Sequence, residues 1–455
     1  MTATAKATSS DFLADLRARG LLHQCTDEAG LAEHLRTADL AGGGRRAYVG
    51  FDPTADSLTI GNLVGIIALG RWQRAGHTPV VVTGGGTGLI GDPSGKSAER
   101  QLLTPERVAA NVANIRKIFS RVLDFGAGRN AAVMTDNIDW LGKLTYLDAL
   151  RDIGKHFSVN MMIQKDSVRE RLHNRDQGIS YTEFSYMILQ SYDFLHLHRE
   201  HGVTLQMGGS DQWGNIVGGC DLIRRCADPA GHNQPAFGLT WPLVTKADGT
   251  KFGKTESGAI WLTGPSGPDD TSPSRTSPYQ FYQFWLNAAD ADVVRFLKTF
   301  TFIPLDEIAA LEQAHAADPG KREAHRALAR HMTGMLHGAD EAAKAEAATR
   351  ALFGKAAAVE DGPFILPPDL VGSAPSSMHE RGLLDGAGIA LVDLLPLTTL
   401  AKSKTEARTL LAQNSISVNG RAAATDARLT AASLLDGSLI ALRKGKKNWH
   451  LTRWG

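Results

Sequence analysis

The stretch RRAYVGFDPTADSLTIGNLVGIIALGRWQRAGHTPVVVTGG (residues 45–85) contains the pattern that decides the fold of the first half of the chain. Residues 45–51 and 78–85 are short apolar runs, which are typical of buried strands. Residues 60–76 between them have the composition of a helix that Gly76 ends. Strand, helix and strand in this order predict parallel strands joined by a right-handed crossover.

The same alternation continues along the chain. Residues 104–123 predict a helix that Thr104 caps, and residues 130–137 predict a third strand. Another strand is expected over 202–209, leading into a helix that begins at Ser210. We therefore predict an α/β fold with a parallel sheet, in which ligands bind at the carboxyl ends of the strands.

The second half changes character twice. The Ala-rich stretch from about 277 to 354 predicts a helical domain, and the Pro-rich residues 360–382 predict a linker. Residues 400–455 contain ten basic and three acidic residues, and Asn419-Gly420 predicts a hairpin turn. A small basic domain indicates contact with RNA or DNA, although a solvated basic surface is the alternative.

Bulk composition narrows the class of protein. The chain has 455 residues, 43% of them hydrophobic, and a net charge of +1, so any basic surface must be local. Cys25, Cys220 and Cys226 form no disulfide framework, and their spacing matches no zinc pattern. The amino-terminal residues contain no apolar signal segment. We expect a soluble, cytoplasmic protein.

A Gly-rich loop follows the second predicted strand. Residues 86–91 match GxGxxG, but Pro93 argues against the helix that a dinucleotide site requires. Gly91 and Gly95 are one residue too close for a phosphate-binding P-loop. The remaining interpretation is a loop whose backbone approaches a ligand, with Asp92 placed to hold a cation.

Four further segments carry polar groups that could form a site. Tyr186, Gln190 and Asp193 share one face of a predicted apolar helix, as a pocket wall or as a solvent-facing stripe. Asp211, after a strand, is expected at a ribose hydroxyl or as a helix cap. Residues 245–255 bear several lysines that could bind a polyphosphate or simply form an exposed hairpin. Residues 57–63 predict a helix start that could hold an anion.

Taken together, these loops resemble those of the bacterial tyrosyl-tRNA synthetases, which are class I aminoacyl-tRNA synthetases. The resemblance runs from about Phe12 to the carboxyl terminus and is carried by YVGFDPTADSL, GTGLIGDPSGK, YTEFSYMILQSYDF, QMGGSDQWGN and LVTKADGTKFGKT. It implies a Rossmann-like α/β catalytic domain (1–245), a phosphate-binding loop with an α-helical domain (246–355), a linker (356–388) and a basic α+β RNA-binding module (389–455).

The resemblance also implies the reaction. Tyrosine attacks the α-phosphate of ATP, bound as its Mg²⁺ complex, and the tyrosyl group then moves to the 3′ end of tRNA(Tyr). It implies a homodimer without a membrane segment or a protein-bound structural metal.

The site residues implied by the resemblance fall into four sets. The tyrosine set is Tyr48, Asp92, Tyr186, Gln190, Asp193 and Gln212. The ATP set is Gly50, Asp52, Gly61, Gly209, Asp211, Lys246 and Lys254. The catalytic set is Thr54, Thr59, Asn62, Lys96, Arg100, Lys251, Lys254 and Thr255. The RNA-binding set is Lys402, Lys404, Arg408, Lys444, Lys446 and Lys447.

Some positions depart from the family pattern. Thr59 and Asn62 stand where the family's HIGH-type signature has histidines, and the loop at 264–276 is longer than expected. These departures motivate an alternative, a synthetase-like RNA-binding protein without aminoacylation activity. A nucleotide-dependent oxidoreductase is a third hypothesis, which Pro93 disfavours.

Overall fold

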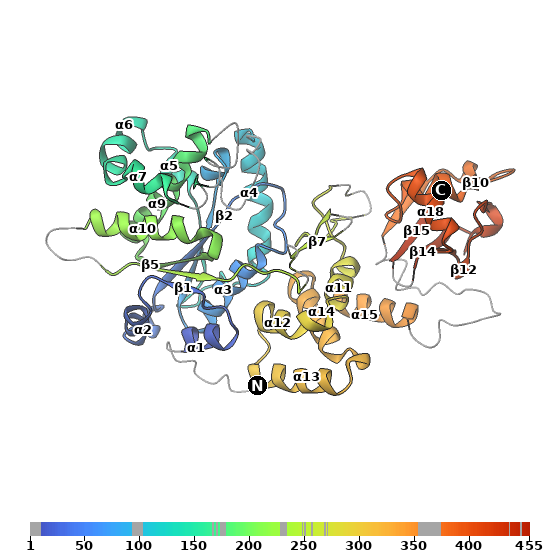
Figure 1. Ribbon diagram of the computed structural model, residues 1–455, viewed down its shortest axis with the longest axis horizontal. Helices are drawn as coiled ribbons and strands as arrows, with labels where there is room; N and C mark the ends of the chain where they lie inside the picture. Colours follow the sequence, from blue (N-terminus) through green and yellow to red (C-terminus); the bar gives the residue numbers. More distant parts are fainter. Residues whose placement is uncertain are drawn as a thin grey trace. The chain divides into compact units, whose positions relative to one another are not determined.

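The computed structural model describes residues 11–92, 103–165, 168–169, 172, 179–227, 234–247, 249, 252–255, 258–267, 270, 272–353, 375–435, 437–445 and 448–455. The chain, whose helices and strands are labelled in Figure 1, divides into two compact units. The first comprises Met1–Lys254, Ala259–Thr263 and Ala289–Ala324, and the second comprises Thr255–Gly258, Gly264–Ala288 and His325–Gly455. Among the described residues, no helix combines the length and apolar character needed to cross a membrane.

The first unit is built on a six-stranded sheet of order β1-β6-β5-β2-β3-β4. Strands β2 to β6 are parallel, and β1 pairs antiparallel with β6 at the edge. Because β2 lies between β5 and β3, the strand order reverses there, and α/β sheets bind ligands at such a point. The predicted α/β class is therefore confirmed. The strands are β1 (Gln24–Cys25), β2 (Arg46–Phe51), β3 (Thr78–Thr83), β4 (Val133–Asp136), β5 (Val203–Gly209) and β6 (Phe237–Trp241).

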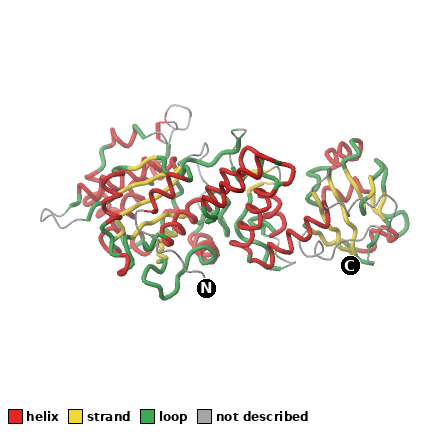
Figure 2. The backbone as a smooth tube through the Cα atoms, turned by 90° about the horizontal axis from the view of Figure 1, so that it is seen from below, coloured by secondary structure: helices red, strands yellow, loops and turns green. Residues whose placement is uncertain are grey.

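Helices lie on both sides of this sheet (Figure 2). Helices α9 and α10 pack on each other and against β5, whereas α3 packs against β2 and β3. The longer helices of the unit are α1 (Asp11–Ala18), α2 (Glu28–Arg36), α3 (Leu63–Arg74), α4 (Pro105–Phe119), α9 (Tyr181–His201), α10 (Trp213–Arg225), α12 (Asp290–Phe300) and α13 (Leu305–Ala317). Short ones are α5 (Ile138–Leu141), α6 (Tyr146–Asp148), α7 (Val159–Ile163), and the 3₁₀ turns η2 (Thr87–Leu89) and η5 (Ser210–Gln212).

A buried arginine explains why residues 289–324 belong to the first unit. Arg71 of α3 pairs with Asp15 at 3.2 Å and donates to the backbone carbonyls of Lys298, Thr299 and Thr301. A buried guanidinium needs such partners, so the end of α12 is tied to α3. The first unit thus continues past residue 245, and the domain limits expected from the sequence stay predictions.

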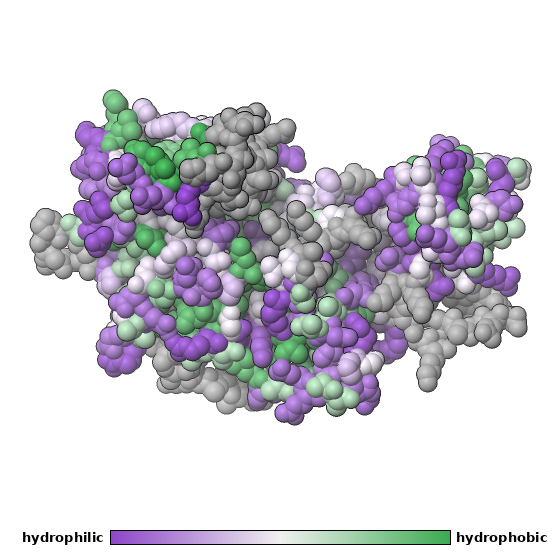
Figure 3. All heavy atoms as spheres, viewed as in Figure 1, coloured by the Kyte–Doolittle hydropathy of each residue, from purple (hydrophilic) through white to green (hydrophobic). Residues whose placement is uncertain are grey.

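Exposed apolar side chains of the first unit gather over α5, α6, α7 and the start of α9 (Figure 3). Leu147 is 76% exposed, Tyr146 65% and Tyr181 62%. An apolar surface of this kind marks an interaction site in soluble proteins. The members are Ile138, Tyr146, Leu147, Leu150, Val159, Met161, Ile163, Leu172 and Tyr181, which we call the apolar face.

The second unit contains α11 (Pro278–Leu286), most of α14 (Glu323–His337) and α15 (Ala339–Phe353), followed by a small α+β module. The module has a five-stranded sheet of order β12-β11-β14-β15-β9. Its strands and helices are β9 (Ser376–His379), β10 (Ile389–Ala390), α17 (Leu391–Leu394), α18 (Lys404–Ala412), β11 (Ile416–Val418), β12 (Arg421–Ala422), β13 (Arg428–Leu429), β14 (Leu439–Lys444) and β15 (Asn448–Trp454). Short strands β7 (Lys254–Thr255) and β8 (Gly258–Ala259) lie where the chain passes between the units.

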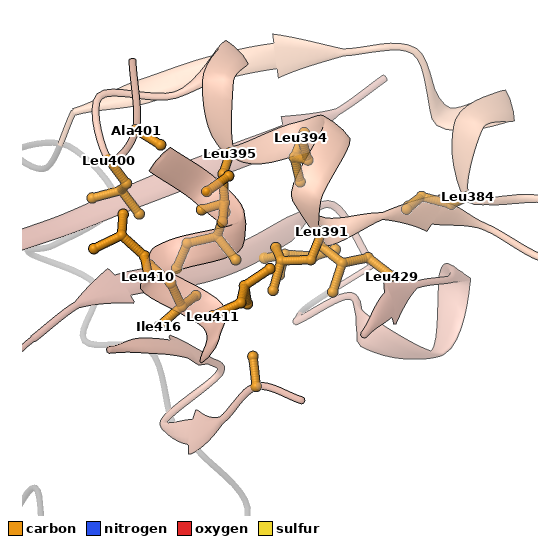
Figure 4. Packing of buried hydrophobic residues seen from close by; sticks show 14 of the residues in the cluster. Leu384, Leu391, Leu394, Leu395, Leu400, Ala401, Leu410, Leu411, Ile416 and Leu429 are labelled. Atoms are coloured by element: carbon orange, nitrogen blue, oxygen red, sulfur yellow. The ribbon is translucent and has the colours of Figure 1, made fainter. Parts of the chain in front are cut away.

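Leucines from α17 and α18 form the core of the module, with Ile416 of β11 (Figure 4). The predicted turn is confirmed, since Asn419 and Gly420 have φ values of 46° and 80°, as a two-residue hairpin requires. Strand β9 pairs in parallel with β15, and Leu384 is part of the core. The folded module therefore begins before the predicted boundary at residue 389.

Candidate active site

The loops at the carboxyl ends of the parallel strands are joined by buried polar side chains. Asp52 follows β2, and its carboxylate accepts hydrogen bonds from Thr87 Oγ1 at 2.8 Å and from Tyr186 Oη at 3.1 Å. A Cβ on Gly84 would lie 2.2 Å from Asp52 Oδ1, so a larger residue at this position would displace the Asp52 carboxylate. The Gly-rich loop thus lies close to Asp52, and its approach to a ligand stays a prediction.

Asp193 is buried on α9 and is held by two donors from the loop after β4. Asn137 Nδ2 donates to Oδ2 at 2.9 Å, and Trp140 Nε1 donates to Oδ1 at 2.7 Å. Burial raises the pKa of Asp193 to about 7, although these two hydrogen bonds act in the opposite direction. Each oxygen keeps a further lone pair, so the carboxylate can accept another hydrogen bond from a ligand.

The phenol of Tyr48, on β2, is close to this carboxylate. Its hydroxyl is buried and has no hydrogen-bond partner among the described residues. Burial, and next the charge of Asp193, raise its pKa well above the ordinary value. A buried hydroxyl without a partner costs free energy, which a polar ligand group can recover.

A second polar cluster lies between α9, α10 and the Gly-rich loop. Gln212 Nε2 donates to Asp92 Oδ2 at 2.8 Å, and its Oε1 accepts from Gln190 Nε2 at 3.3 Å. Asn215 Nδ2 donates to Gln190 Oε1 at 3.0 Å. The cluster offers amide and carboxylate oxygens that can accept hydrogen bonds from an ammonium group.

These contacts decide between the two interpretations of α9. Tyr186 and Asp193 are buried, and Gln190 contacts the second cluster. The face formed by these three residues is therefore turned inward, and the solvent-facing alternative is wrong. Asp211 lies within η5, whose N-cap position is Gly209, so Asp211 is not a helix cap.

The residues in the HIGH-type positions contact each other. Thr59 donates from both its backbone N–H, at 3.0 Å, and its Oγ1, at 2.9 Å, to Asn62 Oδ1. Asn62 occupies the N-cap position of α3 without a side-chain bond to the helix. The Asn62 Nδ2 group is therefore not used in this pair and remains available as a donor.

The lysine-bearing segment is brought beside this pair. The Ile60 N–H donates to the Ile260 carbonyl at 2.9 Å, and the Ile260 N–H donates to the Gly253 carbonyl at 3.1 Å. Gly253 has a φ of +83°, and a Cβ there would lie 2.4 Å from Ile60. Two motifs that are far apart in sequence thus meet at one place.

The remaining predicted residues are placed only in part. Thr54 is exposed in the turn after β2, with Gly50 in that strand, and Gly61 is exposed before α3. Lys246 is described, whereas of Lys254 and Thr255 only the backbone, in β7, is described. Lys96, Arg100, Lys251, Lys446 and Lys447 lie outside the described residues.

The basic module presents its predicted lysines near acidic partners. Lys404 pairs with Asp393 at 2.7 Å and Lys444 pairs with Glu406 at 3.0 Å, while Lys402 and Arg408 are exposed. Ion pairs at a solvent-accessible surface contribute little stability, so these groups can exchange their partners for phosphates.

The sequence patterns assigned no role to the side chains that hold Asp193 and Gln190, which are Asn137, Trp140 and Asn215. They also assigned none to Thr87, which donates to Asp52 and accepts from Asn137. The position of Asn137 in the sequence could have indicated a role, because Asn137 directly follows β4 at the edge of the sheet where ligands were expected.

Comparisons with known proteins identify the family of the chain. A family model described as class I tRNA synthetases (W and Y) matches residues 42–354, and one described as the tyrosine–tRNA ligase SYY-like C-terminal domain matches residues 377–452. The chain belongs to the class I tRNA synthetases.

Individual relatives narrow the family. The chain is 48% identical to the tyrosine–tRNA ligase of Roseiflexus castenholzii, over 97% of this chain and 99% of the relative. It is 47% identical to that of Dechloromonas aromatica, over 98% and 99%. A truncated mitochondrial tyrosyl-tRNA synthetase of Aspergillus nidulans matches with a TM-score of 0.64 and 28% identity, over 75% of this chain and 94% of that one. Within its class, the chain is a member of the tyrosine–tRNA ligase family.

Proposed function

We propose that this chain activates L-tyrosine with ATP and transfers the tyrosyl group to tRNA(Tyr), using polar side chains of β2 and α9 to read the amino acid. The observation that carries this proposal is the buried pair formed by the unpartnered Tyr48 hydroxyl and the Asp193 carboxylate. A substrate phenol would complete the hydrogen bonds of both groups, whereas phenylalanine would leave them unpaired. Rejection of phenylalanine through unpaired polar groups is already a known property of tyrosyl-tRNA synthetases in general.

The other end of the amino acid would meet the second polar cluster. Asp92, Tyr186 and Gln190 would bind the α-ammonium group, and Gln212 would lie beside the carboxylate. Because Gln212 already donates to Asp92, the cluster is assembled before substrate arrives. Such preorganisation lowers the entropy cost of binding.

ATP, as its Mg²⁺ complex, would lie along the strand ends on the other side of Asp52. Thr59, Asn62 and the segment that contains Gly253 meet there. The reaction requires orientation and stabilisation of charge on phosphate, and no protein nucleophile. The side chains proposed for the nucleotide and its phosphates are Thr54, Lys96, Arg100, Asp211, Lys246, Lys251, Lys254 and Thr255.

The test is tyrosine-dependent exchange of labelled pyrophosphate into ATP by the purified, folded protein. We expect exchange with tyrosine and very little with phenylalanine. Absence of exchange would remove the proposal in favour of an RNA-binding protein without aminoacylation activity. Lys254→Ala should slow adenylate formation with little change in tyrosine affinity, and a collapse of tyrosine binding would overturn its assignment to the phosphate side.

We further propose a cytoplasmic homodimer whose interface is the apolar face. Its aromatic and aliphatic side chains are too exposed for a monomer surface, and Tyr146 and Tyr181 lie side by side within it at 3.5 Å between their hydroxyls. Sedimentation should show a dimer that Leu147→Asp dissociates. A wild-type monomer at micromolar concentration would contradict this interface.

A further inference from the structure

The indole of Trp140 is held by α9 at two points. At its edge, Nε1–H donates to Asp193 Oδ1 at 2.7 Å. On its face, the imidazole of His196 stacks with a centroid separation of 4.5 Å and an interplanar angle of 18°. Asp193 and His196 are three residues apart on the helix, so they lie on the same side of α9 and hold the same ring.

We propose that His196 is a positioning residue, which holds the Trp140 indole in the orientation that donates to Asp193 and thereby supports recognition of the substrate phenol. The inference rests on the proposed role of Asp193 in binding tyrosine. His196 would contact neither substrate nor reacting atoms and would act only through Trp140.

The surroundings of Trp140 explain why the ring needs this support. Helix α5, which carries Trp140, spans only Ile138–Leu141, so the orientation of the buried indole depends on the side chains that pack against it. Beside the ring lies a cavity of about 440 Å³, which Trp140 and His196 line together with Lys143, Tyr192 and His201. Removal of the imidazole would enlarge this cavity next to the indole, so the ring could rotate away from Asp193.

Rotation of the indole would have a specific consequence. Asp193 is buried, and Asn137 supplies its only other hydrogen bond from the described residues. A buried carboxylate that loses a donor is harder to ionise and less well oriented. Binding of a phenol hydroxyl should weaken, whereas binding of a phenyl ring without a hydroxyl should not.

The contribution of His196 is that of a flat ring. Burial, and next the neighbouring His201, lower the pKa of His196 below its ordinary value, so the ring is uncharged at neutral pH. An uncharged aromatic ring of similar size should replace it. His196→Phe is therefore the conservative variant, and His196→Ala removes the stack.

The experiment measures KM, kcat and the preference for tyrosine over phenylalanine in pyrophosphate exchange. His196→Ala should raise the KM for tyrosine roughly 3- to 10-fold, the range of one aromatic contact, with kcat within about twofold of wild type. The KM for phenylalanine should stay constant, so the preference falls. His196→Phe should restore wild-type values. His201→Ala is the matched control, because His201 lines the same cavity and its ring centroid lies 6.0 Å from that of His196. This variant should change neither KM nor the preference for tyrosine.

Two further variants separate this inference from the proposed function. In a Trp140→Phe background, which lacks the indole donor, His196→Ala should add no further loss of preference. An additional loss, an equal effect on both amino acids, or no rescue by His196→Phe would overturn the positioning role. Asp193→Asn tests the assignment beneath it. If Asp193→Asn left the KM for tyrosine unchanged, the assignment of Asp193 to tyrosine binding would be wrong. If Asp193→Asn raised that KM but His196→Ala left it unchanged, only the role of His196 would be wrong.

Discussion

The hydroxyl of Thr59 donates to the side-chain carbonyl of Asn62 at 2.9 Å, and the Thr59 N–H donates to the same oxygen at 3.0 Å. The two residues that replace signature histidines thus form one unit. Asn62 orients its amide by accepting twice, which points its N–H groups away from Thr59. A fixed amide donor at the start of a helix can meet a phosphate, because the helix N-terminus also favours negative charge.

Asn62→Ala should therefore slow adenylate formation by about 100-fold, the loss typical of one preorganised donor, with little change in the KM for tyrosine. Asn62→Asp is the informative partner, because it keeps an acceptor for both bonds from Thr59 and replaces the amide donor with a negatively charged oxygen that repels phosphate. Single-turnover pyrophosphate release measures both. If Asn62→Asp kept the wild-type rate, Asn62 would serve only to orient Thr59.

Thr59→His tests whether the site has been rebuilt around the shorter side chain. The imidazole cannot reproduce the short bond to Asn62 from the same position, so we expect slower pyrophosphate release than in the wild type. A faster rate would mean that the family histidine still fits and that Thr59 is a weaker substitute.

Tyr48→Phe should separate stability from binding. The Tyr48 hydroxyl is buried without a partner in the described part of the chain, so its removal should leave the ligand-free protein equally stable or up to about 1 kcal/mol more stable. Tyrosine affinity should nevertheless fall by about 10-fold, since the ligand loses one hydrogen bond. Urea unfolding and equilibrium titration provide the two readouts.

Tyr279→Phe is the matched control, because the Tyr279 hydroxyl of α11 is also buried without a partner among the described residues. It should change stability in the same direction and leave tyrosine affinity unaltered. Destabilisation of ligand-free Tyr48→Phe would show that its hydroxyl has a structural partner.

The preference for tyrosine over phenylalanine should rise with pH through about 7. The pKa of Asp193 is raised to about 7 by burial, so the group is protonated below that pH and becomes a carboxylate acceptor above it. The ratio of kcat/KM for the two amino acids, followed from about pH 5.5 to about pH 8.5, cancels effects on their shared ammonium and carboxylate groups. The ratio should level off above the pKa, and a flat wild-type profile would contradict the assignment.

Stability offers an independent check on the same group. Because the folded pKa is raised from 3.8, the folded state retains a proton that the unfolded state has lost, so the unfolding free energy falls as pH rises between these two pKa values. Asp193→Asn should remove this decline and flatten the tyrosine preference as well. If Asp193→Asn kept the wild-type pH profile in both assays, the group that titrates would not be Asp193.

Removal of residues 375–455 should leave pyrophosphate exchange intact and abolish most tRNA charging. The basic residues of the module would supply contacts to phosphate, which amino acid activation does not need. A chain truncated after residue 388 should be less soluble than the 1–374 variant, because β9 would lose its partner β15 and Leu384 would be exposed. Equal loss of exchange and charging in a soluble 1–374 variant would contradict a separate RNA-binding role.

Much of the site was predictable because its residues follow local rules. Tyr186, Gln190 and Asp193 share a helix face by spacing alone, and the Asn419-Gly420 turn follows from backbone sterics. The partners Asn137 and Trp140 were not predictable, since they meet Asp193 only after β4 and α9 are placed around the sheet. The first strand of the folded module was not predictable for the same reason, as β9 reaches its sheet through pairing with the last strand.

The sequence by itself determined the helices and strands of this protein and the parallel arrangement of the strands. It also showed that the polar loops carry the motifs of one protein family. Periodicity and turn chemistry act over a few residues and can therefore be read from the chain. Only the tertiary structure decided which side chains complete one another: the donors that hold Asp193, the unpartnered hydroxyl of Tyr48 and the bond between Thr59 and the acceptor of Asn62. Hydrogen bonds require atoms within about 3 Å, and that proximity depends on strand order and packing, which no local pattern encodes.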